Sequence, residues 1–151
     1  MKKILFAASE AVPFMKTGGL ADVTGSLPKY FDKKNYDVRV ILPKYVCMEE
    51  RWKGQLHFLC HFYVNLSWRK QYVGIFETTY DGITYYLVDN EFYFAGNAPY
   101  NNIYEDVEKF AFFSKAVLEA LPYLDFCPDI IHCHDWQTGL DRKSTRLNSS
   151  H

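Results

Sequence analysis

The first 43 residues constrain the fold of this 151-residue chain more than any other part of its sequence. Residues 3–8 form a short apolar run, which is typical of a buried parallel strand. Apolar residues then recur at helical spacing from Leu20 to Phe31, and residues 37–42 form a second β-prone run that Pro43 closes. This order predicts a βαβ unit with two parallel strands and a right-handed crossover.

The middle of the chain predicts an antiparallel addition to that sheet. Three runs, at residues 56–66, 72–78 and 83–88, are rich in Phe, Tyr, Val and Ile, and Asp81-Gly82 separates the last two as in a two-residue hairpin. An amphipathic helix ending at Pro122, a buried strand within residues 128–136 and a helix from about residue 138 complete the pattern. We expect an α/β fold: a Rossmann-like, doubly wound, mainly parallel sheet with an antiparallel hairpin excursion, to which residues 83–88 return.

Composition argues against two classes of partner. The net charge is −1 and basic residues form no stripe, which disfavours nucleic acid and a polybasic membrane surface. The first apolar run stops at Glu10, too short for a signal peptide, and no run has the length of a membrane span. The four cysteines lack CxxC spacing and are expected to be reduced and mostly buried. We therefore expect a cytoplasmic protein.

A candidate binding turn, Lys16-Thr17-Gly18-Gly19, separates the first predicted strand from the first helix. Adjacent glycines let the backbone approach a ligand closely or adopt a positive φ, and a helix N-terminus presents N–H groups that suit phosphate. Lys16 adds a positive charge. An ordinary strand-to-helix turn with a solvated lysine fits the pattern equally well, and the spacing alone does not decide between them.

A second candidate site is His132-Cys133-His134-Asp135-Trp136, at the end of the last predicted strand. Alternation places His132 and His134 on one face, near the crevice where α/β sheets bind ligands. Chemistry alone favours a core role for His132 and a hydrogen bond from His134 to a polar substrate. A metal site of His132, His134 and Asp135 is a weaker alternative because no distant ligand can be named, so we expect no metal.

Residues 91–104 are predicted to form a loop, because they contain Gly96, Pro99 and three asparagines. This loop also carries five aromatic residues. It is either an exposed surface on which sugars stack or a lid packed on the core, and the packed lid is favoured.

Together these motifs resemble the N-terminal half of bacterial glycogen synthases, the starch-synthase-type glucosyltransferases. The resemblance covers residues 1–140 and rests on these stretches in order: Glu10, KTGGLADV at 16–23, GSLP at 25–28, LPKY at 42–45 and HCHDWQTGL at 132–140. It implies the GT-B architecture, two Rossmann-like domains facing a cleft, of which residues 1–140 are a truncated N-terminal part. It also implies transfer of glucose from ADP-glucose to the non-reducing end of an α-1,4-glucan such as glycogen, with retention of configuration and without a metal or cofactor.

The resemblance also assigns site residues by motif. Two residues match catalytic positions: His134, which would hydrogen-bond the transferred glucose, and Asp22. The residues that match substrate contacts are Lys16 at the donor phosphates, Gly18 and Gly19 in the same turn, His132 as the alternative to His134, and Tyr93 at the sugar.

Residues 141–151 fit neither this family nor the predicted last helix. These eleven residues back-translate, codon by codon, into a common short-read sequencing adapter. We hypothesise that residues 141–151 are a non-native tail; a natural polar tail is the alternative. Sequencing the genomic locus distinguishes them, because those codons in authentic DNA would contradict the hypothesis.

The leading expectation is therefore a partial glycogen or starch synthase catalytic domain that is inactive by itself. One alternative is a stand-alone sugar- or nucleotide-binding Rossmann-like module. Another is a different GT-B glycosyltransferase that uses another nucleotide sugar. The missing second domain would discriminate between the two enzymes, because the resemblance places the base and ribose contacts there.

Overall fold

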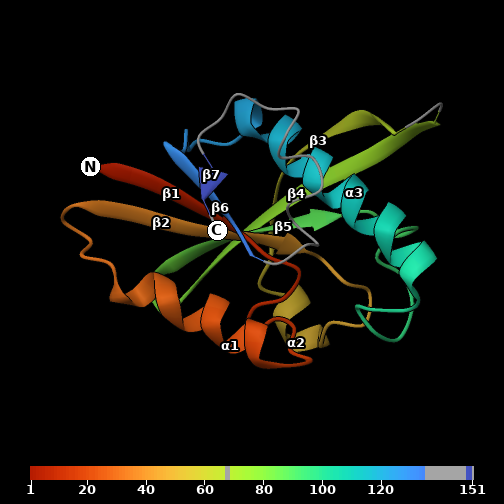
Figure 1. The fold of residues 1–151 in the computed structure, drawn as a ribbon, viewed down its shortest axis with the longest axis horizontal. Helices are drawn as coiled ribbons and strands as arrows, with labels where there is room; N and C mark the ends of the chain where they lie inside the picture. The colour runs from red at the N-terminus through yellow and green to blue at the C-terminus, as the bar shows by residue number, and fades with distance from the viewer. Residues whose placement is uncertain (67–68, 135–148, 151) are drawn as a thin grey trace.

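The structure is a computed structural model that describes residues 1–66, 69–134 and 149–150 (Figure 1). The strands are β1 (Lys2–Ala7), β2 (Tyr36–Pro43), β3 (His57–Leu66), β4 (Arg69–Tyr80), β5 (Ile83–Asp89), β6 (Ile130–Cys133) and β7 (Ser149–Ser150). The helices are α1 (Gly19–Ser26), α2 (Glu50–Lys53) and α3 (Ile103–Ala120), with the 3-10 turns η1 (Leu27–Tyr30) and η2 (Leu121–Tyr123). The strands form one mixed sheet in the order β3-β4-β5-β2-β1-β6-β7.

The predicted βαβ unit is confirmed. β1 and β2 pair in parallel, with Ile4 opposite Val38, and α1 begins at Gly19 in the connection between them. The α-helix ends at Ser26 and continues as η1. Pro28 accounts for this ending, because its ring opposes further α-helix and it lacks an N–H donor.

The predicted hairpin is also confirmed. Asp81 and Gly82 join β4 to β5 with φ angles of 55° and 79°, the positive values that a type I′ turn requires. β5 pairs antiparallel with β4 and parallel with β2, where Tyr85 lies opposite Val40. Residues 83–88 therefore return to the main sheet, as expected.

The sheet is covered on both faces, which confirms the doubly wound arrangement (Figure 1). Leu5 and Ile131 belong to a core that includes the buried phenylalanines of α3. Phe6 and Val40, on the opposite face, pack with the loop that leads to α1 and with Trp52 of α2. The alternation of side chains along β1 thus divides the apolar residues between two cores.

Two expectations need correction. The predicted loop 91–104 ends earlier, because the Asn102 side chain accepts a hydrogen bond from the Glu105 N–H at 3.1 Å and caps α3. Of the four cysteines, Cys133 is buried, Cys47 and Cys60 are partly buried, and Cys127 is exposed, so most are not buried as expected. Cys133 belongs to the core under α3, while Cys127 lies before the start of β6.

No helix in the described ranges is long and apolar enough to cross a membrane. The helix expected from residue 138 lies outside the described residues, as does most of the tail at 141–151. Of that tail, Ser149–Ser150 is described and pairs in parallel with β6.

Gly25 provides a test of the packing between α1 and the loop before it. A Cβ at Gly25 would overlap Val12 Cγ2 and lie 2.9 Å from the Val12 carbonyl oxygen. We expect Gly25→Ala to lower the free energy of unfolding by about 1–3 kcal/mol, measured by urea denaturation of the 151-residue polypeptide. Gly54→Ala is the matched control, since its Cβ would meet no atom closer than 3.8 Å. Equal losses in both variants would contradict this account.

Candidate functional site

The C-terminal ends of β5, β2, β1 and β6 lie at one edge of the sheet, because these four strands are parallel. Hydrogen bonds there join the loops after β5, β2 and β1. The Tyr45 hydroxyl, after β2, donates to the Ser9 carbonyl oxygen at 2.6 Å. Ser9 Oγ, after β1, lies 2.6 Å from the Tyr100 hydroxyl, after β5. This edge is where open α/β sheets bind ligands.

The glycine turn lies in the loop after β1. Gly18 is the N-cap of α1 in an extended conformation, with φ −163° and ψ −161°, and no side chain caps this helix within the described residues. Neither Gly18 nor Gly19 has a positive φ, and a Cβ on either would meet no atom within 4 Å. Neither chain conformation nor internal packing therefore requires glycine here. The open space leaves the positive end of α1 accessible to an anion.

Lys16 and Asp22 form an ion pair at the entrance to this turn. Their Nζ and Oδ2 atoms are 2.9 Å apart, and the side chains are 55% and 54% exposed. An ion pair this exposed contributes little to stability. The Lys16 ammonium can therefore exchange Asp22 for another anion at small cost.

Glu10 and Thr17 are hydrogen-bonded to each other, and sequence analysis assigned a role to neither residue. The Glu10 side chain is only 2% exposed, and its Oε2 accepts hydrogen bonds from Thr17 N–H at 3.0 Å and Thr17 Oγ1 at 2.5 Å. The available sequence signal was an acidic residue directly after a buried strand. Burial of a charge requires such hydrogen bonds, but the sequence does not reveal which residue supplies them.

His132 and His134 lie on the same side of the chain at the end of β6, as the alternation predicts. Their ring centroids are 4.6 Å apart, and both rings contact Phe6 of β1, at 5.2 and 5.0 Å. The His134 N–H donates to the Ala7 carbonyl oxygen at 3.0 Å. The histidine pair therefore lies beside the end of the strand that leads into the glycine turn.

His134 is only 9% exposed, and its lowered pKa leaves its imidazole neutral at pH 7. Burial lowers its pKa from 6.5 to about 4, and the neighbouring His132 contributes in the same direction. A neutral imidazole hydrogen-bonds through one donor and one acceptor nitrogen. It therefore suits a sugar hydroxyl better than it suits a phosphate.

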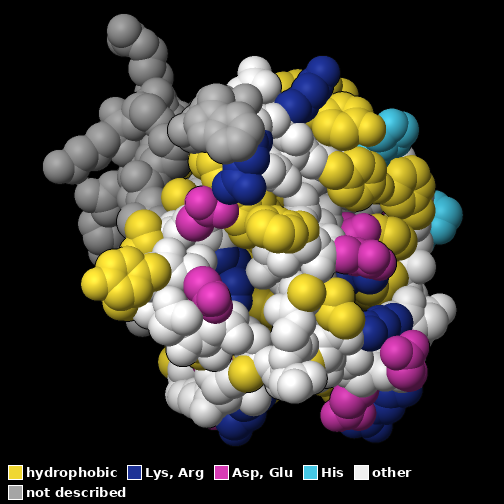
Figure 2. Space-filling model, turned by 90° about the vertical axis from the view of Figure 1, so that its right-hand side faces the viewer, with side chains coloured by type: hydrophobic (Ala, Val, Ile, Leu, Met, Phe, Trp, Pro, Cys, Tyr) yellow, Lys and Arg dark blue, Asp and Glu magenta, His cyan; other side chains and the backbone are white. Residues whose placement is uncertain are grey.

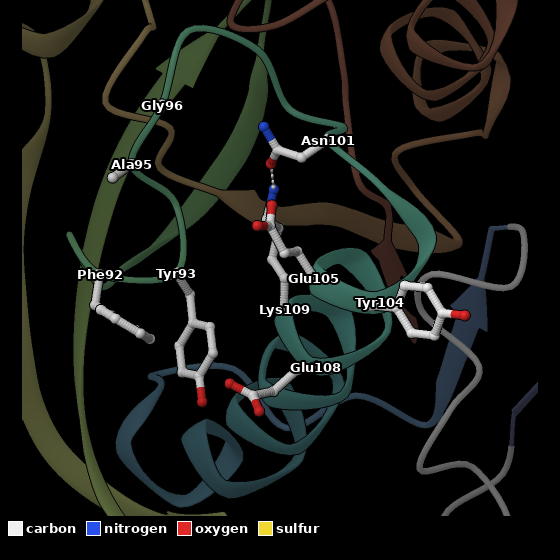
Figure 3. A pocket seen from close by; sticks show the side chains of 9 residues that line it. All are labelled: Phe92, Tyr93, Ala95, Gly96, Asn101, Tyr104, Glu105, Glu108 and Lys109. Atoms are coloured by element: carbon white, nitrogen blue, oxygen red, sulfur yellow. Dashed lines mark hydrogen bonds between the residues drawn. The ribbon is translucent and has the colours of Figure 1, made fainter.

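Tyr93 lies in a different place, a pocket of about 560 Å³ between the loop after β5 and the first turns of α3 (Figure 3). Its ring stacks on Phe112 at 4.7 Å, and its hydroxyl points toward the Glu108 carboxylate. Burial raises the pKa of Tyr93 to about 12, and Glu108 adds to this effect. Among the described residues, no hydrogen bond or ring contact joins Tyr93 to Lys16 or to the histidines.

The aromatic loop is only partly the packed lid that was favoured. Tyr93 and Phe94 are buried, but Phe92 is 68% exposed and Tyr104, which begins α3, is 88% exposed. Phe92 and Tyr104 both line the pocket of Tyr93 (Figure 3). The exposed rings therefore flank a hollow rather than filling the core.

The metal alternative of His132, His134 and Asp135 includes a residue that the structure does not describe. The described residues contain no group of three or more His, Cys, Asp and Glu placed to hold a metal ion. Asp135, the third ligand considered, lies outside the described residues.

On the face where α3 begins, acidic and basic side chains are interspersed, without a continuous basic patch among the described residues (Figure 2).

The sequence is similar to that of known glycogen and starch synthases. The family profile of the starch synthase catalytic domain matches residues 3–143. The glycogen synthase of Lachnoclostridium phytofermentans is 69% identical over 140 residues, covering 93% of this chain and 29% of that protein. The glycogen synthase of Lachnospira eligens is 64% identical with the same coverage. The chain thus spans less than a third of the length of these relatives.

A solved structure is also similar. The catalytic domain of starch synthase IV from Arabidopsis thaliana, bound to ADP and acarbose, matches with a TM-score of 0.72 and 30% sequence identity. The match covers 91% of this chain and 28% of that one.

The lowered pKa of His134 predicts a stability effect with a definite sign. Its folded-state pKa of about 4 lies below the ordinary 6.5, so the unfolded chain binds more protons between these values. Stability should therefore fall as pH drops from 6.5 toward 4, with a slope of at most about 1.4 kcal/mol per pH unit from this group. His134→Phe should remove that part of the slope in urea denaturation. An NMR titration midpoint of His134 at or above 6.5 would contradict the prediction.

Proposed function

The chain belongs to the family of starch synthase catalytic domains, and we propose that it supplies part of the substrate site of a glycogen or starch synthase. The proposed reaction transfers glucose from ADP-glucose to the non-reducing end of an α-1,4-glucan with retention of configuration. Support comes from the glycogen synthases that match at 69% and 64% identity, and from the ADP-bound starch synthase IV. Because the chain spans 29% of those glycogen synthases, the activity is proposed for an enzyme of their length.

The observation that carries the proposal is the open glycine turn at the uncapped start of α1, with Lys16 beside it. The departing ADP gains negative charge as the glycosidic bond to its phosphate breaks. N–H groups at a helix N-terminus and an ammonium stabilise that charge more in the transition state than in the ground state. We assign Lys16, Gly18 and Gly19 to the donor phosphates. We propose Asp22, which pairs with Lys16 at 2.9 Å, as a catalytic residue.

We assign His134 to the transferred glucose. A buried, neutral imidazole at the same sheet edge offers a directed hydrogen bond to a hydroxyl without attracting a competing anion. His132, in ring contact with His134, is the alternative.

Tyr93 is proposed as a contact to sugar from its own pocket. The exposed rings of Phe92 and Tyr104 and the carboxylates of Glu105 and Glu108 line that pocket (Figure 3). Aromatic faces and carboxylate acceptors are groups that suit a neutral, polyhydroxylated ligand.

Two further proposals concern the chain as a whole. We propose that residues 141–151 are a non-native tail, supported by alignments with relatives over 140 residues of the 151, although the family profile extends to residue 143. We also propose a cytoplasmic location, in keeping with the glycogen synthase role proposed from the bacterial relatives.

A chimeric synthase tests the proposed function. Residues 1–140 would replace the matching segment of the L. phytofermentans glycogen synthase, and glucose incorporation into glycogen would be measured with ADP-glucose as donor. We expect transfer by the chimera and none by the 151-residue polypeptide alone. Lys16→Met should lower kcat/KM for ADP-glucose by about 100-fold. Lys29→Met is the matched control, because Lys29 pairs with Asp81 at the hairpin turn, and it should leave kcat/KM unchanged.

The same assay separates the proposal from the binding-module alternative. A stand-alone binding module predicts that the chimera binds nucleotide sugar without transferring glucose. The choice of nucleotide sugar by a different GT-B glycosyltransferase needs its own second domain, because the resemblance places the base and ribose contacts there and the chimera takes that domain from the L. phytofermentans enzyme. An equal loss in Lys16→Met and Lys29→Met would contradict the donor role of Lys16.

Gly19→Ala tests whether the open space at the turn serves the donor. A Cβ at Gly19 meets no protein atom within 4 Å, so the substitution should leave the melting temperature of the chimera nearly unchanged. If phosphate occupies that space, the methyl group should raise the KM for ADP-glucose about tenfold, equivalent to ~1.4 kcal/mol of binding energy. The KM for glycogen should not change. A stable variant with an unchanged donor KM would contradict phosphate binding at this turn.

A further inference from the structure

We infer that Glu10 is a positioning residue of the donor site: its buried carboxylate fixes Thr17 and thereby sets the place of Lys16 and of the N–H groups of Gly18 and Gly19. The inference rests on the donor role proposed for this turn. It adds a residue whose contribution acts through the turn and not through contact with substrate.

The contacts of the turn indicate that Glu10 is its main restraint. Among the described residues, the Glu10 carboxylate is the one side chain that hydrogen-bonds to the backbone of residues 16–19. The same oxygen also accepts from Thr17 Oγ1, so a single atom holds Thr17 at two points. Hydrogen bonds to an ionised acceptor are about twice as strong as neutral ones. The Lys16–Asp22 pair is exposed and restrains the turn weakly.

The residue before Glu10 is held in place by hydrogen bonds. The adjacent Ser9 is fully buried and is held from two sides, by the Tyr45 hydroxyl on its carbonyl oxygen and by the Tyr100 hydroxyl on its Oγ. Because Ser9 is fixed at the edge of the sheet, the adjacent Glu10 and its partner Thr17 are fixed relative to that edge as well. The glycines that follow have no side chains, and a Cβ on either would meet no atom within 4 Å, so no side-chain packing restrains them.

Restraint of this turn has a kinetic consequence. N–H groups and an ammonium stabilise a developing phosphate charge only where they are already aimed at it. A displacement near 1 Å in such groups costs on the order of 100-fold in rate. Loss of the Glu10 contact should therefore weaken donor binding and transfer, while the glucan acceptor should bind as before.

The choice of substitutions separates geometry from charge. Glu10→Gln keeps one oxygen that can accept both hydrogen bonds from Thr17 but removes the negative charge. Glu10→Ala removes the acceptor. Thr17→Val removes the hydroxyl and keeps the backbone bond to Glu10, and Thr17→Ser retains both bonds.

Initial-rate kinetics of the chimeric synthase test the inference, with ADP-glucose and glycogen varied in turn. We expect Glu10→Ala to raise the KM for ADP-glucose at least about tenfold and to lower kcat, with the KM for glycogen unchanged. Glu10→Gln and Thr17→Ser should stay within about threefold of the unsubstituted chimera, and Thr17→Val should lie between. Adding Thr17→Val to Glu10→Ala should have no further effect, because both remove one interaction.

A merely structural role predicts a different result. A destabilised enzyme has fewer active molecules, which lowers the apparent kcat and leaves both KM values unchanged; that outcome in Glu10→Ala would overturn the inference. If Glu10→Ala fails to fold, an unchanged donor KM in Thr17→Val overturns it equally. Absence of transfer by the unsubstituted chimera would contradict the proposed function instead. In that case ADP binding by calorimetry to the same variants still tests Glu10, with weaker binding by Glu10→Ala expected and equal binding contradicting the inference.

Discussion

Parallel pairing of β1 with both β2 and β6 is the constraint on which the rest of the structure depends. It fixes the ends of these strands at one edge, so the glycine turn and the histidine pair, more than a hundred residues apart in the sequence, share that edge. Phe6 links the two motifs directly, because it lies on β1 before the glycine turn and its ring contacts both His132 and His134. The same pairing explains why Ser9 and Glu10, at the exit of β1, reach into three different loops.

The two halves of the candidate site differ in their electrostatics. Lys16 lies at an exposed position in an ion pair with Asp22, where exchange of partners costs little free energy. His134 is buried next to His132, and both effects lower its pKa, so its imidazole carries no charge at neutral pH. In the proposed assignment, one exposed cation and one buried neutral imidazole would separate recognition of an anionic leaving group from recognition of an uncharged sugar. Two cations at these places would instead compete for the phosphate.

Local patterns in the sequence predict most of the fold, and contacts between loops explain what they miss. The Asp81-Gly82 turn and the start of α1 at Gly19 follow from the conformational preferences of the residues themselves. The early start of α3 was missed because Asn102 lies among asparagines and glycine typical of a loop, although an asparagine is also a favoured N-cap. The bond between Glu10 and Thr17 depends on the path of the chain between them, which no periodicity encodes. Tyr93 likewise turns toward α3, and only the packing of its ring on Phe112 reveals that direction.

The glycine pair shows why structure changes the meaning of a sequence motif. Glycines in a turn have two physical explanations, a positive φ or a close approach by another group, and the sequence leaves both open. In this chain Gly82 and Gly96 are of the first kind, with φ angles of 79° and 104°. Gly18 is extended, and both Gly18 and Gly19 have empty space where a Cβ would be, so the first explanation fails for them. The open space is compatible with the second explanation, and the positive end of α1 would favour an anion as the approaching group, as the proposed donor site requires.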